Sequence, residues 1–184
     1  MKTLPLILSV AVAAFAQTLP ESGPLDDGAV AGAIRAANEA EIAAGKLAAR
    51  KAQSREVKRF AKMMVEDHRK NDEKLTAAVR QAGVEPRDSA AAFALKSDSE
   101  RHSAALAGQK GESFDKTYIE QQIAAHKKVL ETIDRALAGG TRRDPAIADY
   151  LKSTRDAVAR HLEHAENLRG RDEQPKGEEP GGGR

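Results

Sequence analysis

The sequence predicts an all-α fold, a four-helix bundle with one long connection between its second and third helices. The composition favours helices, because the chain of 184 residues is rich in Ala, Leu, Lys, Arg and Glu and only 3% aromatic. Four long stretches repeat apolar residues at every third or fourth position, which is the period of an amphipathic helix. Turn signals separate these stretches at Gly83, Pro86, Gly139 and Pro145.

The first 16 residues have the pattern of an export signal. Lys2 supplies a positive charge, residues 4–14 are apolar, and Ala14-Phe15-Ala16 forms an A-x-A cleavage site before Gln17. We therefore expect a signal peptide over 1–16, cleavage between Ala16 and Gln17, and export to a bacterial periplasm. No later stretch reaches the roughly 18 apolar residues of a transmembrane segment. The chain has no cysteine, so its stability must come from burial and not from disulfides.

The first two helices are predicted on either side of a short turn. Residues 17–28 contain two prolines and two glycines and are predicted to be a flexible leader. The first helix is then expected over 29–52. Ser54 is a suitable N-cap for a second helix over 55–82, and Gly83 is a typical stop signal.

The connection at 83–112 is too long for a tight helical hairpin. A structureless loop of this length is unusual, so we expect a crossover that runs along the bundle, as in ferritin-like folds, with a short helix near 98–106. The third helix is predicted from Ser113, as its N-cap, to residue 137. Asp144 and Pro145 indicate the start of the fourth helix. We therefore predict one domain over 29–169 and a polar, disordered tail over 170–184.

Four polar side chains fall on the apolar faces, one near the middle of each predicted helix. Each shares its face with core-forming residues: Glu41 with Ile34 and Ala48, His68 with Met64 and Leu75, His126 with Ile119 and Ile133, and His161 with Leu151 and Val158. At a rise of about 1.5 Å per residue, mid-helix positions meet whichever way each helix runs. Glu41, His68, His126 and His161 are therefore predicted to form one interior layer.

The chemistry of this layer allows two interpretations. One carboxylate and three imidazoles suit a single transition metal ion, Zn²⁺, Fe or Cu. Four protein ligands would close a tetrahedral site, which favours metal handling or envelope stress over catalysis. In the second interpretation the layer is a metal-free hydrogen-bonded network that only fixes helix packing in a structural or interaction protein. A ferritin-type di-iron site is not predicted, because Val65 and Val158 stand where Glu-x-x-His motifs require Glu.

The remaining composition excludes other classes of function. The 30 basic and 28 acidic residues nearly balance, and the chain has two Tyr and no Trp, so a nucleic-acid partner is not expected. The sequence contains no phosphate-binding loop, nucleophile elbow or His-Glu-x-x-His motif that would indicate a nucleotide-dependent enzyme or a hydrolase. Neither a protein partner nor an oligomeric state is indicated.

Several segments together resemble the bacterial family known as domain of unknown function 4142. They are Glu39-Ala-Glu-Ile, Val57 through Met63-Met64-Val65-Glu66-Asp67-His68, Phe114-Asp-Lys-Thr-Tyr118 with His126, and His161-Leu-Glu-His-Ala165. The resemblance covers about residues 29–168 and implies a ferritin-like fold, export, and functional positions at Glu41, His68, His126 and His161. The chain departs from the family pattern at 108–113 and in lacking a Leu-Pro segment before His161.

Overall fold

The computed structural model describes residues 25–139 and 142–172, and these residues form five helices and no strand. The predicted all-α class is confirmed. The helices are α1 (Asp27–Lys51), α2 (Arg55–Ala82), α3 (Ala90–Ala107), α4 (Gly111–Ala138) and α5 (Pro145–Asp172). The predicted signal peptide, most of the leader and the tail beyond Asp172 lie outside the described residues. None of the described helices is long and apolar enough to cross a membrane.

Local sequence signals explain most helix ends. The side chain of Ser54 accepts the backbone N–H groups of Glu56 and Val57, and Gly83 ends α2 in the left-handed conformation at φ 65°. Asp144 accepts the N–H of Ala146 at 2.8 Å, directly before Pro145. These caps are where the sequence predicts them.

Other boundaries differ from the prediction. Helix α1 begins two residues early because Asp26, and not a later residue, caps it by accepting the N–H of Ala29 at 2.9 Å. Ser113 is not an N-cap, because α4 already begins at Gly111, whose φ of 58° lets the chain turn sharply into the helix. Helix α5 continues through Gly170 to Asp172.

Helix α3 is twice the predicted length. The prediction placed a short helix near 98–106, whereas α3 spans 18 residues from Ala90 and is capped by Ser89, which accepts the N–H of Ala92 at 3.1 Å. The helix buries only Ala92, Leu95 and Leu106. Since so few residues face the protein interior, α3 lacks the apolar stripe by which periodicity detects a helix.

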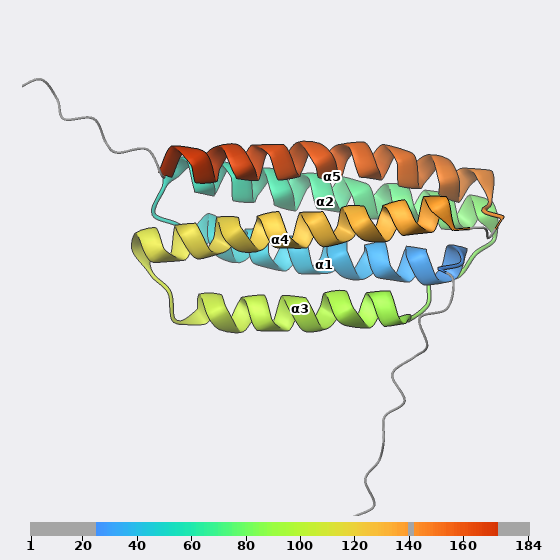
Figure 1. Cartoon of the computed structure of the whole chain (residues 1–184), viewed down its shortest axis with the longest axis horizontal. Coiled ribbons are helices and arrows are strands. Elements are labelled where there is room, and N and C mark those ends of the chain that lie inside the picture. Colours follow the sequence, from blue (N-terminus) through green and yellow to red (C-terminus); the bar gives the residue numbers. More distant parts are fainter. Residues whose placement is uncertain (1–24, 140–141, 173–184) are drawn as a thin grey trace, which may run out of the picture.

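The helices lie with their long axes side by side (Figure 1). Helix α1 contacts α2, α3 and α4, and α5 contacts α2 and α4. The colours of Figure 1 show that α2 and α4 run in one direction and α1, α3 and α5 in the other. Helix α3 therefore carries the chain back along α1 from the end of α2 to the start of α4.

Two separate apolar clusters form the core, and a polar layer lies between them. The first cluster includes Ala37 of α1 and Val129 of α4, and the second includes Ala48 of α1 and Ile123 of α4. Between these positions neither helix contributes a buried residue to either cluster. The same interruption occurs on α2 between Met64 and Leu75 and on α5 between Val158 and Ala165. All four predicted site residues fall inside these interruptions.

Candidate metal centre

The four predicted site residues are buried side chains. Glu41 is 7% exposed, His68 6%, His126 2% and His161 8%. An ionisable group in an apolar interior costs several kcal/mol unless it has a partner. Their partners therefore determine what this layer does.

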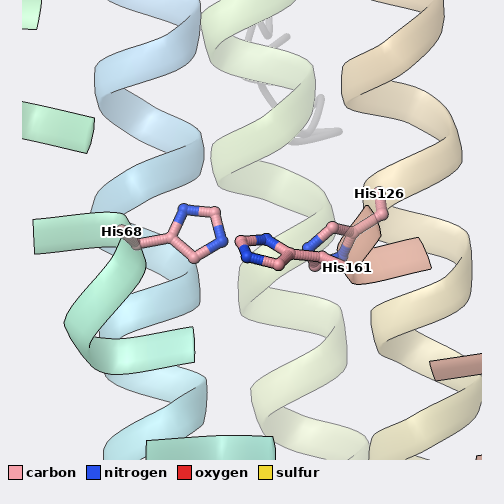
Figure 2. A group of neighbouring side chains, drawn as sticks. All are labelled: His68, His126 and His161. Carbon is pink, nitrogen blue, oxygen red and sulfur yellow. The ribbon is translucent and has the colours of Figure 1, made fainter. Parts of the chain in front are cut away.

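The three imidazoles converge on one point. His68 from α2, His126 from α4 and His161 from α5 point toward one another (Figure 2), with ring centroids 5.5–5.8 Å apart. One nitrogen of each ring lies within 4.8 Å of one nitrogen of both others. A tetrahedral ion bound at about 2.0–2.1 Å holds such nitrogens roughly 3.4 Å apart. An ion bound here would require the three nitrogens to reach that spacing.

Each imidazole is held from outside by a hydrogen bond at its other nitrogen. His68 Nδ1 lies 3.0 Å from Asn38 Oδ1, and His161 Nε2 lies 3.0 Å from Asp67 Oδ2. His126 Nδ1 lies 2.8 Å from the backbone oxygen of Gln122. All three partners are acceptors, so in each case the ring nitrogen is the donor.

This arrangement fixes the tautomer of all three rings. A neutral imidazole that donates through one nitrogen presents a lone pair at the other. The inward atoms are His68 Nε2, His126 Nε2 and His161 Nδ1, and none of them has a hydrogen-bond partner among the described residues. Three acceptor lone pairs thus meet in the protein interior. Metal-binding histidines in proteins are oriented by outer hydrogen bonds in the same way.

The interior disfavours protonation of two of the rings. Burial, followed by the neighbouring imidazoles, holds the pKa of His68 well below its usual range. Burial also lowers the pKa of His161, although the hydrogen bond to Asp67 acts in the opposite direction. Metal binding requires neutral imidazole, so the lowered pKa values of His68 and His161 favour the form of these two rings that binds a cation.

Glu41 does not join the three histidines. It faces the interior, as predicted, but it is not a member of the group whose ligand atoms converge. Its Oε2 accepts a hydrogen bond of 2.7 Å from Gln122 Nε2. The residue of α1 that forms a hydrogen bond with one of the histidines is Asn38, three residues and about 4.5 Å earlier along the axis. The estimate of depth along the helices was too coarse to separate the two.

Two residues around the histidines were missed by the sequence reasoning. Asn38 is 1% exposed, and its Oδ1 accepts from both His68 and Asn71. A signal existed, because Asn38 follows Ile34 by four residues and therefore shares its apolar face. Asp67 gave no such signal, since it lies at the edge of the face of α2 and meets His161 only through the packing of α2 against α5.

A cleft between α2 and α5 reaches the histidines from the surface. It has a volume of about 330 Å³, and both His68 and His161 line it. Met63, His164 and Thr154 lie along the same cleft. Ions and water can therefore approach the cluster from this side.

Comparison with known proteins identifies a family. No curated protein and no solved structure shows a significant match to this chain. A family model described as a domain of unknown function (DUF4142) matches residues 11–168, which include all five helices up to the last turn of α5. The chain belongs to this family.

Proposed function

We propose that this chain is an exported, ferritin-like helical protein that binds one transition metal ion through His68, His126 and His161. In this proposal α1, α2, α4 and α5 are the four-helix bundle and α3 is the long crossover between its second and third helices. The contacts of α3 with α1 and α4, and the common direction of α2 and α4 (Figure 1), support that assignment. Export rests on the pattern of residues 1–16.

The observation that carries the metal proposal is the meeting of three unpartnered imidazole nitrogens. A metal-free network would have to supply three hydrogen-bond donors at that point. One water molecule has only two, and the lowered pKa values of His68 and His161 disfavour a third donor from either of these two rings. A single cation satisfies all three lone pairs at once.

The ligand set indicates the kind of metal and its chemistry. Imidazole suits Zn²⁺, Fe and Cu. Three protein ligands leave one coordination position for water or an incoming small ligand, whereas the four predicted from the sequence would have closed the site. Glu41 is not among the residues whose ligand atoms converge, so we leave it outside the primary set. We propose metal handling in the cell envelope as the role.

Elemental analysis of the purified protein, before and after loading with Zn²⁺, tests the proposal. We expect one ion per chain. We also expect His68→Ala and His126→Ala each to weaken metal binding by more than about 100-fold, which exceeds the 10–100-fold loss typical of substituting a residue that only orients a ligand. The metal should also raise the melting temperature, and a chelator should reverse this. His102→Ala, in α3, is the matched control, and Glu41→Gln should also keep the metal. Absence of metal from the loaded wild-type protein would contradict the proposal, and so would a metal content in both ligand variants equal to that of the wild type.

A further inference from the structure

A second cavity lies on the other side of α1, away from the α2–α5 cleft. It has a volume of about 280 Å³ and is enclosed by α1, α3 and α4. Alanines at positions 37, 40, 44, 124 and 125, together with Leu95, Leu106 and Val129, form the apolar part of its wall. The space exists because alanine side chains stand where α3 passes over α1 and α4, so the walls are mainly apolar.

Two buried residues in the lining of this cavity carry hydrogen-bond acceptors. Glu41 and Gln122 line it, and both side chains are more than nine-tenths buried. The side-chain amide of Gln122 donates a hydrogen bond to Glu41 Oε2. The Oε1 of Gln122 has no hydrogen-bond partner among the described residues. The polar groups of Glu41 and Gln122 that lack a donor are thus a carboxylate oxygen and an amide oxygen, and a ligand that contacts them must supply N–H or O–H donors.

The charge of Glu41 is not balanced by an ion pair with any described residue. Lys128 and Arg101, which line the cavity, both pair with Asp98. His102 also lines it, and burial lowers the pKa of this imidazole although the charge of Glu41 acts in the opposite direction. The partner of Glu41 is the neutral amide of Gln122. A buried carboxylate is stabilised strongly by a cation that also donates hydrogen bonds. This favours a cationic ligand over an anionic or neutral one.

From this cavity we infer a binding site for a small organic cation, a primary alkylammonium whose ammonium group contacts Glu41 and Gln122 and whose short alkyl chain packs against the alanines. A bare metal ion fits less well, because Mg²⁺ or Ca²⁺ requires six or more oxygen ligands and the walls are mainly apolar. The volume lies near the lower end of the range of ligand pockets, which suits a small ligand.

Titration of the full chain with n-butylammonium, followed by NMR of the backbone amides, tests this inference. We expect saturable shifts at residues 40–44 and 121–125, and no saturable shifts with butyrate or 1-butanol at equal concentration. Glu41→Gln keeps the side-chain volume but removes the charge, and should weaken binding by about tenfold or more. Equal affinity for butyrate, or an unchanged affinity in Glu41→Gln, would overturn the inference.

Two further variants keep the result decisive. Ala124→Leu places a larger side chain at an exposed cavity-lining position and should abolish binding even if Glu41→Gln fails to fold. Binding that persists in Ala124→Leu would place the ligand elsewhere. His68→Ala, which removes a proposed metal ligand outside this cavity, should bind n-butylammonium as the wild type does. The metal proposal and the cation inference can therefore fail independently.

Discussion

The carboxylate of Asp67 provides a sharp test of how the histidines are held. Its Oδ2 accepts from His161 Nε2 at 3.0 Å, which leaves Nδ1 of the same ring directed at the cluster. Asp67→Asn retains an acceptor oxygen at a similar position but removes the charge that makes His161 a more basic ligand. Substitution of a residue that hydrogen-bonds a metal ligand in this way typically lowers the metal affinity by 10–100-fold.

The structure places the expected effect at the lower end of that range. The side chain of Asp67 is 39% exposed, so water screens its charge more than it would screen that of a buried group. We therefore expect Asp67→Asn to weaken Zn²⁺ binding about tenfold, equivalent to about 1.4 kcal/mol. Competition with a chromophoric chelator near pH 7.5 measures this affinity.

Glu66→Gln is the matched control for this substitution. Glu66 precedes Asp67 on the same helix, carries the same charge and is paired with Lys70 at the surface, 2.6 Å away. Its replacement should leave Zn²⁺ affinity unchanged. If Asp67→Asn also binds like the wild type, the hydrogen bond does not orient the ring. If it loses as much affinity as His161→Ala, Asp67 is itself a ligand and the proposed set of three is wrong.

Two predictions concern stability. Asp115→Ala removes a buried carboxylate that accepts the N–H groups of Gln53 at 2.9 Å and Ser54 at 2.6 Å in the α1–α2 turn, so urea denaturation should show a loss of about 2–4 kcal/mol with metal content unchanged. In the metal-free protein the pKa values of His68 and His161 lie below the ordinary 6.5, so the unfolded chain binds more protons as the pH falls. The free energy of unfolding should therefore decrease below about pH 6.5, by up to about 1.4 kcal/mol per pH unit for each histidine, and a flat profile between about pH 7.5 and 5.5 would contradict this.

The convergence of the three histidines could be predicted from sequence because two independent signals, the helical period and the turn positions, agree on them. The 100° rotation per residue places His68, His126 and His161 on apolar faces, and the positions of turn signals place each near the middle of its helix. Both apolar core clusters are interrupted at the positions of these histidines, so the polar side chains of the different helices lie in the same layer. In a set of parallel and antiparallel helices of similar length, mid-helix positions meet whatever the topology.

Glu41 shows the limit of the same reasoning. Periodicity places it in the interior correctly, but the histidine layer meets α1 at Asn38, three residues earlier. This three-residue offset, about 4.5 Å along the axis, is comparable to the error in the predicted helix ends, since α1 begins two residues before its predicted start. Contacts across helices, such as that between Asp67 and His161, depend on which helices are neighbours, and the sequence pattern does not contain that information.

Gln122 lies between the two proposed sites, and its two roles use different atoms. Its backbone oxygen accepts from His126 Nδ1 and so orients a metal ligand, whereas its side-chain amide donates to Glu41 at the floor of the cavity. The backbone oxygen is held by α4 itself, so a change in the partner of the side chain does not move it. Glu41→Gln should accordingly leave the orientation of His126 intact and affect only the cavity. A large loss of Zn²⁺ affinity in Glu41→Gln would instead mean that the carboxylate completes the coordination of the metal, as a fourth ligand.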